Sequence, residues 1–141
     1  MSLLVRDRML SHHFSIGAAM PATDVYELFT LWRFRDLPVV AGGKVVGLLT
    51  ARTALERLPE PVIAGGDEAP QVTFPGLVAA DLLADDDLRT IHVDEPLEDA
   101  ALALQILRAD ALAVEDDDGR PCGVLRRADV MPAAETLSLA A

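Results

Sequence analysis

The second half of this 141-residue chain repeats the first half at a spacing of about 75 residues. Ile16 matches Ile91 at an offset of 75, and Gly47 matches Gly123 at an offset of 76, so the spacing slips by one residue at a loop. An internal repeat constrains the fold strongly, because each copy forms one unit that needs its neighbour to bury an apolar face. Two similar units in one chain also predict a shared cleft between them, where a ligand is expected.

Local patterns predict the same order of elements in both copies. In the first copy, two apolar strands flank Gly42-Gly43, which is typical of a hairpin, and Thr50 is placed to cap the helix that follows. An earlier helix is expected to be capped by Thr23 or Asp24. The second copy is predicted to have a helix at 77–83, a strand at 90–93, a helix at 97–107, strands at 112–114 and 122–125, and a final helix from 128.

Each copy therefore reads as helix, strand, helix, hairpin, helix. A three-stranded sheet with helices on one face leaves its other face uncovered, so the two copies are expected to pack sheet to sheet. We predict an α+β fold of two tandem repeats related by pseudo-two-fold symmetry. Repeat 1 is assigned to 1–58, a linker rich in Pro and Gly to 59–75, and repeat 2 to 76–141, together forming one domain.

The charge distribution argues against a nucleic-acid partner, since the net charge of −11 does not suit a phosphate backbone. Residues 1–66 carry a balance of +1 and residues 67–141 a balance of −12, so an anionic ligand would meet less repulsion near the first copy. No apolar stretch reaches the roughly 18 residues of a membrane span, and no secretory signal is evident. With a single cysteine, Cys122, the chain is expected to be cytoplasmic, in a reducing compartment.

Several motifs in the chain resemble those of the CBS-domain pair, also called the Bateman module. The entry Val5–Met9 resembles the family's V-x-D-x-M opening, and Leu37–Thr50 resembles its L-P-V-V, turn, G-x-h-h-G-h-h-T signature. Asp117–Leu125 has the same part in the second copy, with Ala113 in place of the usual proline and Leu83 in place of the usual methionine. The resemblance covers nearly the whole chain.

The resemblance implies a regulatory module that binds AMP, ADP, ATP or S-adenosylmethionine in the cleft between the repeats, with no required cofactor. The family signature G-h-x-[ST]-x-x-[DN] implies a hydroxyl near the phosphate and a carboxylate on the ribose. The first copy has Thr50 for the hydroxyl but Thr53 for the carboxylate, whereas the second has Asp129 for the carboxylate but Arg126 for the hydroxyl. A guanidinium can hold a phosphate at two points, so Arg126 or Arg127 favours the second site for a nucleotide.

Two candidate sites follow from this resemblance. Site 2 is predicted to comprise Asp129, Arg126, Arg127, His92, Leu112 and Val114. Site 1 is predicted to comprise Thr50, Thr53, Arg52, Ile16, Leu37 and Val39. His12-His13 is interpreted as a solvated loop, with contact to a phosphate at the cleft mouth as the alternative.

Further interpretations stay open or are set aside at this point. The alternative function is a ligand-free dimerisation or protein-interaction module with degenerate nucleotide sites. A homodimer is expected, and the ligand-sensing module would signal to a separate, unknown protein. Leu31, Trp32 and Phe34 are either a dimer contact or core. The acidic runs at 85–87 and 116–118 lack the spacing of a calcium loop, so no metal is expected. No nucleophile–base set or phosphate-loop motif is found, so the chain is not expected to be an enzyme.

Overall fold

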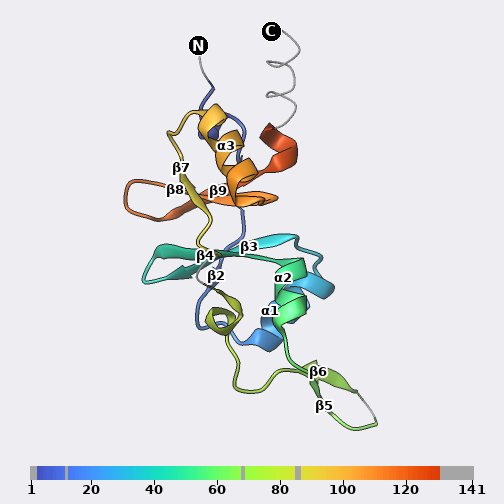
Figure 1. The fold of residues 1–141 in the computed structure, drawn as a ribbon. Helices are drawn as coiled ribbons and strands as arrows, with labels where there is room; N and C mark the ends of the chain where they lie inside the picture. The colour runs from blue at the N-terminus through green and yellow to red at the C-terminus, as the bar shows by residue number, and fades with distance from the viewer. Residues whose placement is uncertain (1–2, 12, 68, 85–86, 131–141) are drawn as a thin grey trace.

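Two β-sheets packed face to face form the centre of the structure (Figure 1). The computed structural model describes residues 3–11, 13–67, 69–84 and 87–130 of the chain. The first sheet has the strand order β2-β3-β4, and the second has the order β1-β9-β8-β7. The strands are β1 (Leu10–Ser11), β2 (Ile16–Gly17), β3 (Asp36–Ala41), β4 (Lys44–Thr50), β7 (Thr90–His92), β8 (Ala111–Glu115) and β9 (Pro121–Arg126).

Each sheet is a hairpin extended by a parallel strand. In the first sheet, β3 and β4 pair antiparallel and β2 joins β3 in parallel; β8, β9 and β7 repeat this arrangement in the second. The turn between β3 and β4 has φ values of +59° at Gly42 and +80° at Gly43, which only glycine adopts without cost. The predicted Gly-Gly hairpin and the predicted fold class are both confirmed.

Helices cover the outer face of each sheet. The α-helices are α1 (Ala22–Thr30), α2 (Ala51–Arg57) and α3 (Leu97–Leu107), the 3-10 helices are η1 (Val5–Asp7) and η2 (Ala79–Leu82), and residues 127–130 are also helical. The predicted cap of α1 is wrong, because Pro21 is the N-cap residue and Thr23 and Asp24 lie inside the helix. The hydroxyl of Thr23 instead accepts the N–H of Phe74 at 2.9 Å.

The face between the two sheets is lined by small and medium-sized apolar side chains. Ala111, Ala113 and Val124 of the second sheet pack there with Val45 and Leu48 of the first. Because side chains alternate along a strand, Leu112, between Ala111 and Ala113, points the other way, into the core of its own lobe. Each lobe thus has its own apolar core beside the shared seam.

The entry segments of the two repeats are exchanged between the lobes. Leu10 of β1 pairs with Val124 of β9, and Val5 is fully buried in the core of the second lobe. Conversely, Ala79 of η2 lies in the core of the first lobe, and its N–H donates to the carbonyl of Met20 at 2.8 Å. Each lobe is therefore completed by a segment of the other repeat, which ties the two together beyond the seam.

The predicted linker contains a small hairpin. Strands β5 (Val62–Ala64) and β6 (Gln71–Thr73) pair antiparallel and project from the first lobe (Figure 1). Phe74 anchors this hairpin, since it is buried and its ring lies 5.3 Å from that of Tyr26. None of the helices within the described residues has the length and apolar character to cross a membrane.

Candidate ligand site between the repeats

The sandwich has two opposite edges with different character. Both hairpin turns lie at one edge, where the N–H of Val45 donates to the carbonyl of Gly119 at 2.9 Å (Figure 1). The last residues of β4 and β9, Thr50 and Arg126, lie at the other edge, where a helix begins directly after each strand. A strand such as β4, of seven residues, spans about 20 Å, so the edges are well separated. We call the edge with the two turns the hairpin edge and the edge where the two helices begin the helix-start edge.

At the helix-start edge, Arg126 of the second repeat contacts Asp36 of the first. Nε of Arg126 lies 3.2 Å from Oδ2 of Asp36, and its Nη2 lies 3.3 Å from Oδ1. The guanidinium therefore binds the carboxylate at two points, the strong geometry for such a pair. The backbone N–H of Arg126 donates to the Asp129 carboxylate at 3.1 Å, so Asp129 caps the helix that begins here.

Asp36 is a buried carboxylate with two side-chain partners. Its side chain is 5% exposed, and Nε2 of His13 lies 3.2 Å from Oδ1. Burial raises the pKa of Asp36, but hydrogen bonds from His13 and Arg126 outweigh burial, so the pKa lies below its ordinary value. Asp36 is therefore held as a carboxylate inside the seam.

His13 closes this cluster. Its Nδ1 lies 2.9 Å from the carbonyl of Phe14, and because a carbonyl oxygen only accepts, Nδ1 carries the proton in this contact. Nε2 can then accept from Arg126 Nη2, 3.4 Å away, or donate to Asp36 when the ring is protonated. The side chain is 5% exposed, so the expected solvated loop is wrong for His13. His12 lies outside the described residues, as do 85 and 86 of the first acidic run.

Arg127 points away from the seam. Its Nη2 donates to the carbonyls of Ala109 at 3.1 Å and Leu104 at 3.4 Å, at the C-terminal end of α3. Free carbonyls at a helix end attract a cation, so Arg127 has a local structural role. Of the two arginines predicted for a phosphate, the structure places Arg126 alone at the seam.

The site of the first repeat is built from hydroxyls. The N–H of Thr53 donates to Oγ1 of Thr50 at 3.2 Å, and the Thr50 hydroxyl lies 2.9 Å from that of Thr53, so the predicted cap of α2 is confirmed. Arg52 pairs with Glu56 on the outer surface, where its side chain is 88% exposed. Thr50 and Thr53 thus lie together at the helix-start edge, and Arg52 extends into solvent.

The apolar residues of the two predicted sites lie in the lobe cores. They are 0–2% exposed and pack among their own lobe's core residues: Ile16, Leu37, Val39, Leu112 and Val114. Strand alternation explains this placement, because the intervening residues Ala111 and Ala113 face the seam instead.

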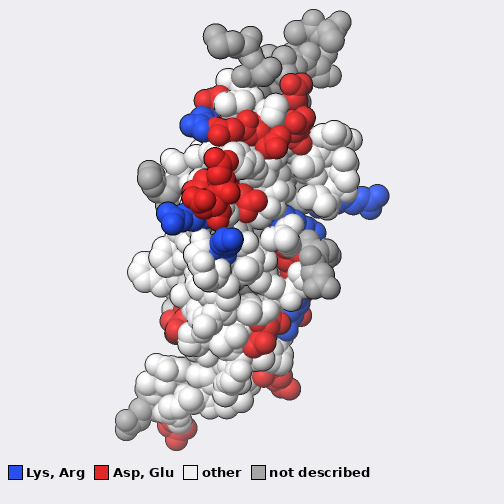
Figure 2. All heavy atoms as spheres, turned by 90° about the vertical axis from the view of Figure 1, so that its left-hand side faces the viewer, with Lys and Arg blue, Asp and Glu red and all other residues white. Residues whose placement is uncertain are grey.

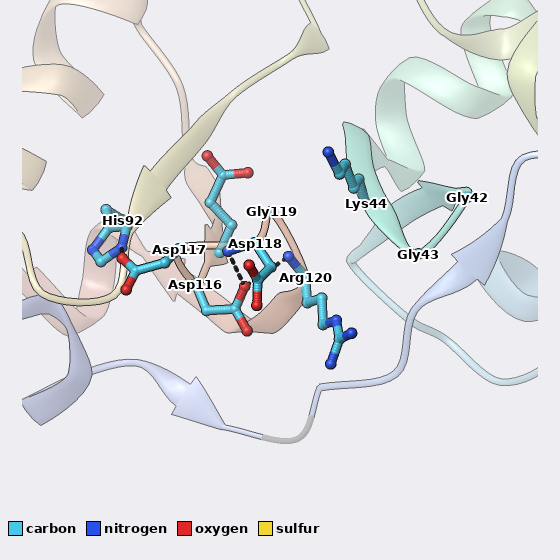
Figure 3. A pocket seen from close by; sticks show the side chains of 10 residues that line it. Gly42, Gly43, Lys44, His92, Asp116, Asp117, Asp118, Gly119 and Arg120 are labelled. Carbon is cyan, nitrogen blue, oxygen red and sulfur yellow. Dashed lines mark hydrogen bonds and ion pairs between the residues drawn. The ribbon is translucent and has the colours of Figure 1, made fainter.

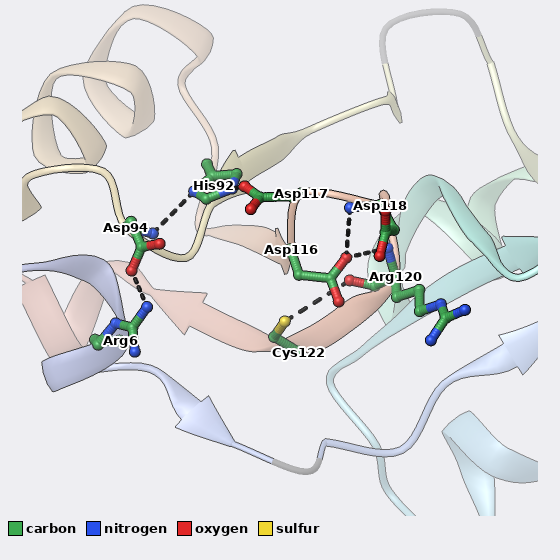
Figure 4. Close-up of polar contacts among 8 residues, drawn as sticks. All are labelled: Arg6, His92, Asp94, Asp116, Asp117, Asp118, Arg120 and Cys122. Atoms are coloured by element: carbon green, nitrogen blue, oxygen red, sulfur yellow. Dashed lines mark hydrogen bonds and ion pairs between the residues drawn. The ribbon is translucent and has the colours of Figure 1, made fainter.

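His92 lies at the hairpin edge. It pairs with Glu115 at the far end of β8, whereas Arg126 pairs with Ala111 at the near end. The N–H of Asp94 donates to its Nδ1 at 3.0 Å, so Nε2 donates to Asp117 at 2.5 Å (Figure 4). The structure therefore separates His92 from the other members of predicted site 2.

The hairpin edge forms an open, acidic concavity of about 670 Å³ between the two turns (Figure 3). Its lining comprises Gly42, Gly43, Lys44, His92, Glu115, Asp116, Asp117, Asp118, Gly119 and Arg120. Figure 2 shows acidic side chains gathered on this face with basic ones beside them. Within the described residues, no group of three or more His, Cys, Asp or Glu is arranged to hold a metal ion.

Two residues of this cluster at the seam, Asp36 and His13, were not among the site residues predicted from the sequence. A single acidic residue directly before the apolar run Leu37–Val40 was the available signal, because a charge next to a buried strand needs a partner. The partner itself, Arg126, lies 90 residues away. Local patterns carry no information about such a contact.

The fold and the seam define a module of two tandem αβ repeats that exchange their entry segments. The family model of the CBS domain matches residues 5–60 and 79–135, and the chain belongs to the CBS domain family. Among curated proteins, none matches this chain in sequence.

Similar solved structures are CBS-domain pairs. CBSX2 in complex with AMP is 23% identical, with a TM-score of 0.68, covering 96% of this chain and 98% of that one. The CBS domains of a transcriptional regulator from Streptococcus pneumoniae are 20% identical, with a TM-score of 0.67, covering 92% and 98%. The CBS pair of MJ0100 in complex with 5′-methylthioadenosine and S-adenosyl-L-methionine is 18% identical, with a TM-score of 0.66, covering 96% and 98%. At these identities the likeness establishes the shared fold.

Proposed function

We propose that this chain is a cytoplasmic regulatory module that binds an adenosine-containing ligand between its repeats and signals to a separate protein. Similar CBS pairs are solved in complex with AMP, with S-adenosylmethionine and 5′-methylthioadenosine, and with ATP. The observation that supports the proposal is that Arg126, the last residue of β9, contacts Asp36 across the seam and donates its backbone N–H to the Asp129 carboxylate. The proposed role is ligand sensing, and no residue is assigned a catalytic step.

The geometry suggests how a ligand would be sensed. Asp129 presents a carboxylate suited to a pair of ribose hydroxyls, next to Arg126, which contacts Asp36 of the other repeat. A ligand bound at Asp129 lies beside the contact of Arg126 with Asp36, and a change in that contact alters the relative position of the lobes. A ligand shifts such an equilibrium only by its differential affinity for the two arrangements. Thr50 and Thr53 offer a second, hydroxyl-lined position in the first repeat.

The test is thermal unfolding with millimolar adenosine, AMP, ATP or S-adenosylmethionine. A ligand that binds only the native state must raise stability, by about 2.7 kcal/mol at a concentration of 100 times Kd. Asp129→Asn should abolish the ligand-dependent shift, measured against the ligand-free melting point of the same variant. Asp99→Asn, in the first turn of α3, is the matched control and should retain the shift. No stabilisation by any of these compounds would reject the proposal.

A second candidate function is a ligand-free association module, and exposed apolar side chains favour it. Leu31 is 73% exposed, Trp32 72% and Ile106 of α3 70%, and such groups on a soluble protein commonly mark contacts with another chain. This candidate predicts a homodimer whose mass in sedimentation does not depend on concentration or on adenosyl compounds. A monomer that responds to a ligand would reject it.

A further inference from the structure

The two repeats differ in charge at equivalent positions of the helix-start edge. In the first sheet, Asp36 pairs with Thr50 across β3 and β4; in the second, Ala111 pairs with Arg126 across β8 and β9. The pseudo-equivalent of Asp36 is thus Ala111, and that of Thr50 is Arg126. Among these four positions, Arg126 is the cation and Asp36 the anion, and the two meet across the seam, whereas Thr50 and Ala111 are uncharged.

This cross-seam pair engages one edge of the Arg126 guanidinium and sets a neutralising charge against it. Two of its nitrogens are engaged by Asp36, whose side chain is 5% exposed. A phosphate bound alongside would stand next to a buried carboxylate of like charge. A phosphate that replaced Asp36 would leave that carboxylate buried with His13 as its remaining side-chain partner. Breaking a buried ion pair from one side is strongly unfavourable.

We propose that Asp36 is a specificity-determining residue, which occupies Arg126 and thereby makes the second site prefer adenosine ligands without a 5′-phosphate over nucleotides. The inference rests on the proposed function and deepens it by naming the ligand class. The Asp36 carboxylate binds the Arg126 guanidinium where the phosphate of a nucleotide would otherwise bind. The ribose carboxylate, Asp129, is outside this pair and serves both ligand classes equally.

The test compares adenosine with AMP, which differ only by the phosphate, in titration calorimetry. The measured quantity is the ratio of the Kd for adenosine to the Kd for AMP. In the natural sequence the ratio is expected to be about one or lower. Asp36→Asn keeps the shape and removes the charge, so it should raise the ratio about ten- to a hundredfold, as one charge-assisted hydrogen bond to phosphate is gained.

Two variants separate this contact from general electrostatics. Asp110→Asn removes the same charge from a side chain that is 94% exposed near the same edge, and it should leave the ratio within about twofold of the natural value, because exposed charges are screened. The double variant Asp36→Asn/Arg126→Gln should not show the rise in the Kd ratio that is expected for Asp36→Asn alone. An equal gain in Asp110→Asn, or an unchanged ratio in Asp36→Asn, would overturn the inference.

A variant that keeps Asp36 provides an independent check if Asp36→Asn does not fold. Arg126→Gln should leave the ratio unchanged, since Arg126 contributes little to phosphate binding while it is paired. A natural ratio above ten that falls in Arg126→Gln would show that Arg126 is already free for phosphate and would overturn the inference. If adenosine binds but the Kd ratios differ from those expected, the ligand preference is overturned and the proposed function stands. If neither adenosine nor AMP binds to the natural sequence or to any variant, both the ligand preference and the proposed function are overturned.

Discussion

Gly47 and Gly123 occupy equivalent positions in the two repeats, and alanine at each should have very different effects. A Cβ at Gly123 would lie 2.3 Å from the carbonyl oxygen of Leu10 and 3.3 Å from Cα of Ser11, both backbone atoms of β1. A Cβ at Gly47 would lie 2.9 and 3.1 Å from the two methyl groups of Leu83. The first contact is with a paired strand, whereas the second is with the end of a flexible side chain.

The difference in cost follows from what must move. At Gly123, β1 must shift by about 1 Å or detach, which combines overpacking, about 1–3 kcal/mol, with loss of ladder hydrogen bonds at about 1 kcal/mol each. We expect Gly123→Ala to lower the free energy of unfolding by about 3 kcal/mol. At Gly47, a rotamer change of Leu83 relieves the contact, so Gly47→Ala should cost about 1 kcal/mol or less.

Urea denaturation of both variants measures this difference, and amide hydrogen exchange at Leu10 and Ser11 locates it. On an edge strand only every second N–H faces the neighbouring strand, so protection at the one of these two amides that donates to β9 should fall in Gly123→Ala and persist in Gly47→Ala, which is the matched control. Equal costs for the two variants, or unchanged exchange at β1, would refute the placement of β1 on β9. Since His13 follows β1 closely, the same displacement should also disturb the contact of its ring with Asp36.

Two further predictions concern the buried carboxylates. Burial raises the pKa of Asp36, but the hydrogen bonds from His13 and Arg126 outweigh burial, so the pKa is lowered in the folded state. A carboxyl with a lowered folded-state pKa stabilises the fold at a pH above its unfolded-state pKa of about 3.9. This contribution is lost as the pH falls through the folded-state pKa. The stability difference between the natural sequence and Asp36→Asn, from urea midpoints, should therefore shrink between neutral pH and pH 3, and a constant difference would contradict this. Arg57→Met removes the ion-pair partner of Asp87, whose side chain is 7% exposed, and should cost about 2 kcal/mol, between the values for exposed and buried pairs. The surface pair of Arg52 is the control, because Arg52→Met should cost less than about 1 kcal/mol, and equal losses would refute the role given to burial.

Elements formed by local rules were predictable from the sequence. The predicted helix at 97–107 is α3 to the residue, because its apolar periodicity and the turn before it are both local. The Gly42-Gly43 hairpin and the Thr50 cap were predicted for the same reason. The exchange of entry segments was not, since nothing local in Leu10 indicates that its partner lies in the other repeat.

The candidate site shows the same limit. Thr50 and Asp129 could be placed at helix starts from the signature, but the partner of Arg126 could not, because that contact depends on the register of two sheets across the seam. Strand alternation also explains why the apolar members of the predicted sites lie in the lobe cores. Ala111 of β8 faces the seam, whereas the next residue, Leu112, faces the core of its own lobe. A pattern of alternating buried residues does not say which face is the lobe core when both faces are covered.

The charge of the second repeat illustrates why segment averages mislead about a site. Its balance of −12 was weighed against an anionic ligand at Arg126. In the structure, the run Asp116–Asp118 lies at the hairpin edge (Figure 3), about 20 Å of strand from the helix-start edge and beyond the screening length of about 8 Å. The buried charge that opposes a phosphate at Arg126 is instead the carboxylate of Asp36, contributed by the repeat whose own balance is +1. We therefore infer that ligand choice at this seam is set by the pair that the two repeats form together, and that divergence at two positions, Asp36 and Arg126, makes two equivalent sites chemically different.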